Sequence, residues 1–184
     1  MASRIDLIAE GYATQVNLAW DRWLSSSERV WFAVYPSEDE RRLRYKLDAF
    51  QLATASAGKR WILVDLTHWF SRWLDLEEDR DRLLADPESL YPLTDEFLAF
   101  VTEEVVRAAQ EADADTVIAI LGAASLYGFA QVSDLVPRVA ERLSGRLLVF
   151  FPGSREGNVY KLLDAREGWN YLATSIAPHD GKNS

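Results

Sequence analysis

Short, continuous runs of apolar residues mark four places along the chain. They cover residues 30–35, 61–64, 116–121 and 147–151, and each is followed at once by a proline, an aspartate or a glycine. Strands buried on both faces have this pattern because neither side of the sheet meets water. The four runs therefore predict four short strands of a parallel sheet.

Between these runs, apolar positions recur every three or four residues, which predicts amphipathic helices. The first covers residues 3–25 with Ser3 as its N-cap, and Ser37 with Glu40 forms a capping box opening a second helix that Gly58 ends. Further expected elements are helices at about 69–74, 94–111 and 133–143, an acidic loop with a helical turn at 75–93, two short strands or a strand pair at 159–163 and 170–176, and a frayed tail at 178–184.

This order of elements predicts the fold class. Buried strands that alternate with helices give an α/β fold, a three-layer sandwich with a mostly parallel central sheet and helices on both faces. The last two strands are expected to extend one edge of the sheet. With 184 residues and no linker-like segment, residues 1–184 are expected to form a single domain.

Ligands of such sheets lie outside the carboxyl ends of the strands, where Asp65, Ser125 and Arg155 are expected. A crevice shared by these three side chains would bind an anion or a nucleotide-like group. The alternative is structural, because short polar residues and glycines at such positions also cap helices and form tight turns. The structural interpretation is the favoured one.

The sequence contains no motif for phosphate handling or nucleophilic catalysis. Gly153 and Gly157 are not followed by the Lys-Ser or Lys-Thr of a phosphate-binding loop, so the fold is Rossmann-like or P-loop-like without the P-loop. Ser125 lacks the flanking glycines of a nucleophile elbow. With no cysteine and only two histidines, a metal site is not expected either. The sequence therefore predicts a protein that is not an enzyme and has no cofactor.

Charge and composition favour a role in protein–protein contact. The net charge of −9 repels a phosphate backbone and argues against direct nucleic-acid binding. Seven tryptophans, seven tyrosines and an excess of arginine over lysine are typical of interfaces. Arg41, Arg42 and Arg44 form the one basic cluster, and Trp169 lies in the most distinctive local sequence, so these four residues are candidates for partner binding. Alternatively, the arginines form a charged helix face that pairs with the preceding acids.

Location is predicted from what the chain lacks. Its longest apolar runs are about half of the ~20 residues that a membrane-spanning helix needs. Its first residues lack the apolar core of a signal peptide. We therefore expect a cytoplasmic protein that does not contact the membrane.

Four segments carry a resemblance to a known family: VWFAVYPSEDERRLRYKL at 30–47, VDLTHWF at 64–70, VIAILGAASLYGFAQVS at 117–133, and residues 145–176 with DAREGWNYL at their centre. In order and content they resemble BrxB, a small component of BREX (bacteriophage exclusion) defence systems. Glu167 stands where the family typically has aspartate, and Tyr127 where it often has phenylalanine.

The resemblance implies a bacterial, non-catalytic component of an anti-phage complex. Its implied role is that of an adaptor or scaffold, with the phosphatase-like PglZ as first partner and the large ATPase BrxC as second. A degenerate nucleotide- or anion-binding regulatory domain of the same system is the alternative, and self-association stays open.

Overall fold

The computed structural model describes residues 2–165 and 168–176. Arg166 and the predicted tail at 178–184 lie outside these residues. The helices are α1 (Arg4–Val16), α2 (Glu40–Tyr45), α3 (Leu47–Ser56), α4 (Trp69–Leu74), α5 (Arg80–Ala85), α6 (Thr94–Ala108) and α7 (Val132–Arg142). The strands are β1 (Val30–Tyr35), β2 (Arg60–Asp65), β3 (Thr116–Leu121), β4 (Arg146–Glu156), β5 (Val159–Leu162), β6 (Trp169–Asn170) and β7 (Thr174–Ile176). The 3-10 helices are η1 (Ser27–Arg29), η2 (Ser37–Asp39), η3 (Pro87–Leu93) and η4 (Ala123–Leu126).

The central sheet has the strand order β2-β3-β4-β1-β7. All neighbours along this path are parallel, with Val30 of β1 opposite Leu147 of β4 and Trp61 of β2 opposite Val117 of β3. The predicted α/β fold with a mostly parallel central sheet is therefore confirmed. The strand β7 extends the edge beside β1, whereas β5 and β6 continue from the end of β4.

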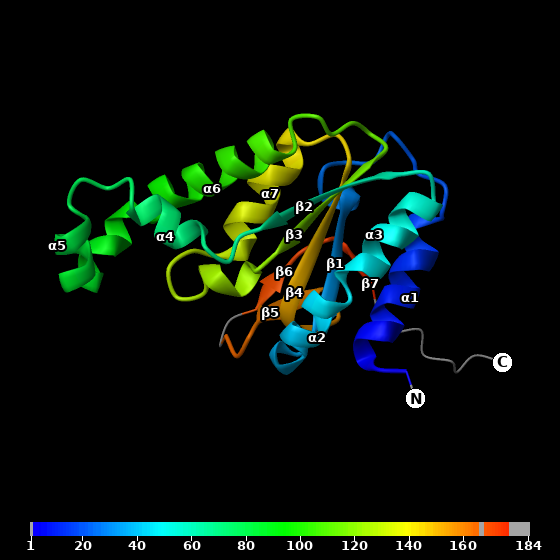
Figure 1. Cartoon of the computed structure of the whole chain (residues 1–184), viewed down its shortest axis with the longest axis horizontal. Coiled ribbons are helices and arrows are strands. Elements are labelled where there is room, and N and C mark those ends of the chain that lie inside the picture. Colours follow the sequence, from blue (N-terminus) through cyan, green and yellow to red (C-terminus); the bar gives the residue numbers. More distant parts are fainter. Residues whose placement is uncertain (1, 166–167, 177–184) are drawn as a thin grey trace.

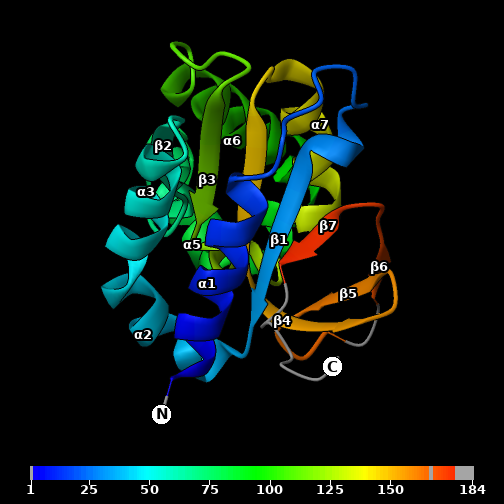
Figure 2. The same cartoon turned by 90° about the vertical axis from the view of Figure 1, so that its right-hand side faces the viewer.

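Helices cover both faces of this sheet, as Figure 2 shows with α1 and α3 on one side and α6 and α7 on the other. Alternate residues of β1 point to opposite faces. Trp31 and Ala33 pack with the apolar side chains of α1 and α3, and Val30 and Phe32 pack with those of α6 and α7. Each face thus has its own hydrophobic core.

The strand β4 is longer than predicted. The expected end at Pro152-Gly153 is wrong, because residues 153–156 continue the strand and pair antiparallel with β5. Gly153 permits this pairing, since a Cβ at this position would lie 2.0 Å from the carbonyl oxygen of Lys161. The result is a hairpin that leaves the main sheet at its carboxyl edge (Figure 2).

The predicted helix over 3–25 ends early. Ser3 forms the expected N-cap, with a capping box to Asp6, but the helix ends at Val16. The indole of Trp20 folds back, donates a hydrogen bond to the carbonyl oxygen of Val16 at 3.1 Å and packs edge-on against Trp31. Trp20 therefore provides a hydrogen bond to a carbonyl group at the end of α1, although its spacing in the sequence predicted that the helix continues through it.

The helix predicted from Ser37 to Gly58 is also interrupted. The segment starts as the 3-10 helix η2, and α2 and α3 are separated at Lys46. The Ser37–Glu40 capping box does not form. Instead, the Glu40 carboxylate accepts hydrogen bonds from Tyr35 and Arg44.

The interpretation of residues 61–64 as a strand buried on both faces is wrong. β2 lies at the edge of the sheet, and of its residues only Val64 is buried. Leu63 and Asp65 are exposed. By contrast, every residue of β3 is buried, as predicted.

Candidate functional site

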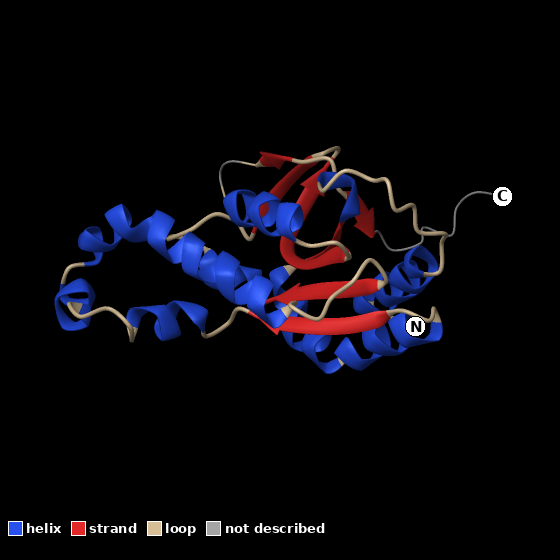
Figure 3. Ribbon diagram, turned by 90° about the horizontal axis from the view of Figure 1, so that it is seen from above, coloured by secondary structure: helices blue, strands red, loops and turns tan. Residues whose placement is uncertain are grey.

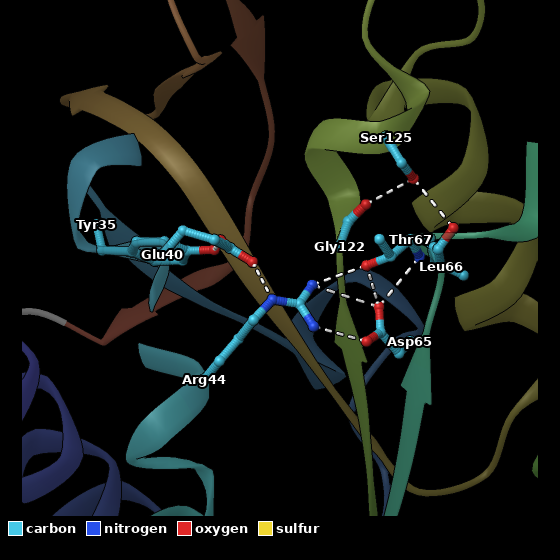
Figure 4. A network of polar contacts seen from close by, with 8 residues as sticks. All are labelled: Tyr35, Glu40, Arg44, Asp65, Leu66, Thr67, Gly122 and Ser125. Carbon is cyan, nitrogen blue, oxygen red and sulfur yellow. Dashed lines mark hydrogen bonds and ion pairs between the residues drawn. The ribbon is translucent and has the colours of Figure 1, made fainter. Parts of the chain in front are cut away.

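The carboxyl ends of the parallel strands carry a polar network, drawn in Figure 4. It joins α2, which follows β1, to the segments that follow β2 and β3. Arg44 lies at its centre, with a side chain that is 35% exposed, and Asp65 opposite it is 38% exposed. The Arg44 guanidinium thus connects α2 to the segment after β2, and Ser125 connects that segment to the loop after β3.

Arg44 uses each of its side-chain nitrogens. Nη1 donates to Asp65 Oδ2 at 2.7 Å, Nη2 donates to Thr67 Oγ1 at 2.7 Å, and Nε donates to Glu40 Oε1 at 2.8 Å. A planar guanidinium is suited to such a fork because its donors have a fixed geometry. The positive charge of Arg44 is therefore held between two carboxylates of its own chain.

The ionised state of Asp65 is favoured by this arrangement. Partial burial raises the pKa of Asp65. Hydrogen bonds from Arg44, the Thr67 hydroxyl and the Thr67 backbone N–H lower it by more than burial raises it, so the net effect is a lowered pKa. The pKa of Arg44 is raised, chiefly by its hydrogen bond to Asp65. The two groups stabilise each other's charge.

Glu40 links this pair to the buried end of β1. Its second carboxylate oxygen accepts a hydrogen bond from the Tyr35 hydroxyl. Burial raises the pKa of Tyr35, and the neighbouring Glu40 raises it further, so the hydroxyl stays protonated and acts as a donor. The network is therefore continuous from Tyr35 to Thr67.

Gly122 allows the network to close. It has a φ of +78°, and a Cβ there would lie 2.7 Å from Thr67 Oγ1 and 2.9 Å from the Thr67 backbone nitrogen. Only glycine combines this backbone conformation with so close an approach. The loop after β3 can thus pack directly on the loop after β2.

The predicted site residues are only partly brought together. Ser125 belongs to the same region, where its hydroxyl contacts the carbonyl oxygens of Gly122 at 2.7 Å and Leu66 at 3.1 Å, so it fastens the two loops. Arg155 lies on the β4–β5 hairpin with its guanidinium over the ring of Tyr160. Arg44 pairs with Asp65 where the sequence suggested Arg155.

The three arginines of the basic cluster differ in their contacts, since two form ion pairs within the chain and the third is exposed. Arg42 pairs with Asp39 at 3.2 Å, and Arg44 pairs with Glu40 and Asp65. For these two residues the structure agrees with the interpretation of a charged helix face that pairs with its preceding acids. Arg41 is exposed.

Trp169 is half-buried. Its ring lies 4.3 Å from that of Tyr171 and 5.6 Å, edge-on, from that of Phe32, measured between centroids. It therefore covers the end of the core above β1, and only part of its ring is open to a partner.

Sequence reasoning did not anticipate a pocket of about 590 Å³ beside Trp169. It lies between the loop that follows β3 and the strands β4 to β6. Its aromatic lining comes from Tyr127, Phe129, Phe151, Tyr160 and Trp169. Gln131 and Asn170 add amide groups that can donate and accept hydrogen bonds. The aromatic residues on both sides of Gly128 and the tryptophan after Gly168 were the available signal in the sequence.

Two kinds of feature are absent from residues 2–165 and 168–176. No group of three or more histidine, aspartate or glutamate side chains is placed to hold a metal ion there. Nor does this part of the chain contain a helix long and apolar enough to cross a membrane. Comparison of the sequence with protein-family models and curated proteins, and of the fold with solved structures, finds no match.

Proposed function

We propose that this protein is a non-catalytic, cytoplasmic component of a BREX anti-phage defence system that acts as an adaptor. Its first partner is PglZ, and it bridges from there to BrxC. The resemblance of four ordered segments to BrxB supports the biological process, defence against phages. The observation that carries the molecular role is the closed network at the carboxyl edge, where Arg44 and Asp65 bind each other.

The closed network supports binding through the outer surface because a ligand site needs free polar groups. All three Arg44 nitrogens already donate to oxygens of the chain. An incoming anion would have to displace the Asp65 carboxylate, and this would leave that carboxylate without its charge partner. Ser125 is likewise engaged with backbone oxygens.

The surface offers the residue types that protein interfaces prefer. Trp23, in the loop after α1, and Tyr45 of α2 are large aromatic side chains that are almost entirely exposed, and Arg41 of α2 is exposed as well. Aromatic residues and arginine are enriched in the centres of interfaces because they bury a large area at a small cost in conformational entropy.

Co-purification tests the proposal. The unaltered chain is co-expressed with PglZ and, separately, with BrxC from the same defence system, and each mixture is separated by affinity capture followed by gel filtration. We expect the chain to elute with PglZ at micromolar concentrations. Elution of the chain alone in both mixtures contradicts the adaptor role.

A second candidate function is the binding of a nucleotide or another small anion as a regulatory ligand, and the aromatic pocket supports it only by offering rings on which a base can stack. Its volume lies in the range of small-molecule sites. A ligand at a hundredfold excess over its Kd stabilises a protein by about 2.7 kcal/mol, which corresponds to roughly 5–10 °C in Tm for a chain of this size. Melting curves with ATP, ADP and GTP, each with Mg²⁺, are expected to show no shift, and a shift of that size supports the second function instead.

A further inference from the structure

A helical arm projects from one end of the molecule. Figures 1 and 3 show α4, α5 and the start of α6 extending away from the sheet. We define the arm as residues 75–96, which run from the end of α4 through α5 and η3 into α6. Because it extends beyond the two layers that cover the sheet, most of its surface is not used in the core.

The base of the arm is firmly packed. Phe97 of α6 lies 5.5 Å from Phe70, 5.3 Å from Trp73 and 5.3 Å from Phe129, measured between ring centroids. Further out, Leu83 of α5 is buried. Aromatic clusters of this kind fix the relative positions of the elements that contribute to them. The arm is therefore held in a defined position relative to the rest of the fold.

Large apolar side chains are nevertheless exposed on the arm. Leu76 is 70% exposed, Leu84 53% and Tyr91 64%. Isolated exposed apolar residues need no explanation, but three within one short projecting segment offer apolar area that the fold itself leaves uncovered. Their burial against a partner would be favourable because it removes apolar area from water.

The charge of the arm limits what that partner can be. Residues 75–96 contain nine acidic and two basic residues, a net charge of −7 out of −9 for the whole chain. Both arginines are used within the arm, since Arg80 pairs with Asp75 at 3.0 Å and Arg82 with Asp79 at 2.8 Å. Asp95 pairs with Arg138 of α7 at 3.5 Å. The other carboxylates give the arm a negative surface, which complements a positive surface and repels nucleic acid.

We propose that the arm is the docking element of this protein, and that it inserts Leu76, Leu84 and Tyr91 into an apolar groove bordered by arginine and lysine side chains on a protein partner. The inference rests on the proposed adaptor function and names the surface and the partner's chemistry. The apolar residues supply the buried contact, and the carboxylates steer the approach and select the partner.

Two arm variants test this inference against the partner that retains the unaltered chain, PglZ or BrxC. The first replaces four exposed acids of the arm that make no ion pair in the described structure, Glu78→Gln, Asp81→Asn, Asp86→Asn and Glu88→Gln. The second is Leu84→Ala. Surface-plasmon resonance measures association and dissociation rates at low and high salt.

Matched controls change the same chemistry on the body of the protein. Four exposed acids there are neutralised together, Glu10→Gln, Asp48→Asn, Asp134→Asn and Glu141→Gln. Leu52→Ala removes a side chain of α3 that is 68% exposed. Arg41→Ala tests the basic helix α2 as a competing docking surface. Circular dichroism confirms that each variant is folded before binding is measured.

The expected result is specific to the arm. Neutralising its acids slows association about tenfold at low salt and much less at high salt, because screening removes long-range attraction. Leu84→Ala speeds dissociation about tenfold, a fold-change typical of residues central to an interface. The two body variants, the four neutralised acids and Leu52→Ala, stay within about twofold of the unaltered chain, as expected for sites outside an interface.

Other outcomes overturn the inference. If the partner binds the arm variants as tightly as the unaltered chain, or if only Arg41→Ala weakens binding, the arm is not the docking element, although the adaptor function stands. If gel filtration shows that the arm instead joins two copies of this chain, the inference is also wrong. If neither PglZ nor BrxC binds the unaltered chain, both the inference and the proposed function fail.

Discussion

At the scale of single residues, Arg44 decides what the carboxyl edge of the sheet can do. Its position in a basic cluster suggested a partner contact, yet its side chain turns inward to Glu40, Asp65 and Thr67 (Figure 4). Asp65 could be singled out from the sequence because it follows a strand. Its partner could not, since Arg44 lies 21 residues away and meets Asp65 only after the chain has folded.

Asp65→Asn tests the strength of this pair. Both side chains are more than a third exposed, so we expect a loss of only about 1 kcal/mol at pH 7. Because the pKa of Asp65 is lowered in the folded protein, its stabilisation is present above the ordinary pKa of 3.8 and is lost as the pH falls through the lowered value. Urea unfolding should therefore show a difference at pH 7 that shrinks at pH 3. An equal difference at both pH values contradicts the pairing.

Gly122→Ala tests the close contact of the two loops, with Gly128→Ala as its matched control. Both glycines have a positive φ, but a Cβ at Gly128 has open space around it, whereas one at Gly122 meets Thr67. The control should cost about 1–2 kcal/mol for backbone conformation alone, and Gly122→Ala should cost clearly more. Equal losses in thermal unfolding would show that the contact with Thr67 is unimportant.

At the scale of elements, the sequence predicted what depends on neighbouring residues and missed what depends on distant ones. The strand β1 and the strand β3 occur at the predicted residues because their apolar runs are bounded by Pro36 and Gly122. The edge position of β2 was not predictable, since strand order is set by long-range packing. Trp20 fits the spacing of the first predicted helix, but its ring packs against Trp31 outside that helix. This contact depends on a distant residue and could not be predicted from the local pattern.

The packing of α1 on α3 includes a buried polar contact. The hydroxyls of Tyr12 and Thr54 lie 2.5 Å apart, and Thr54 also donates to the carbonyl oxygen of Phe50. Tyr12 is therefore the donor to Thr54, and burial raises its pKa. The contact joins the two helices on one face of the sheet.

A double-mutant cycle measures this contact. Tyr12→Phe and Thr54→Val each remove one hydroxyl, and each should cost about 1 kcal/mol, the typical value of a buried hydrogen bond. The double variant should cost less than the sum of the two single variants by about 1 kcal/mol. Additive losses in urea unfolding would mean that the hydroxyls do not interact.

At the scale of the whole molecule, carboxylates stabilise the fold at neutral pH although the net charge is strongly negative. The pKa values of Asp6, Glu103, Asp113 and Asp115 are all lowered, chiefly by hydrogen bonds to Lys46, Arg142, Thr116 and Lys59 respectively. Groups with lowered pKa values stabilise the folded state above their ordinary pKa and cease to do so as the pH falls.

Acid unfolding follows from this distribution. The Tm should be nearly constant from pH 7 to pH 5 and should fall steeply below about pH 4, where the carboxylates of the unfolded chain take up protons while those of the folded state are still ionised. Differential scanning fluorimetry over this range checks the expectation. A Tm that rises as the pH falls towards 3 would show that repulsion among the acids outweighs their pairing.

The molecule therefore combines two features: a carboxyl edge whose polar groups bind each other, and an acidic arm that projects from one end. Its fold class could be read from the alternation of buried runs and amphipathic segments. The projecting arm could not, because the sequence of residues 75–93, acidic and with two prolines, predicted only a loop with a helical turn. The base of the arm is held by the aromatic side chains of Phe70, Trp73, Phe97 and Phe129, which only the fold brings together.

Sedimentation velocity of the purified chain mixed with purified PglZ tests the account most directly. At micromolar concentrations we predict one faster-sedimenting species that contains both proteins and that persists without nucleotide or metal. If the two proteins sediment independently, with BrxC present or absent, the chain is not an adaptor.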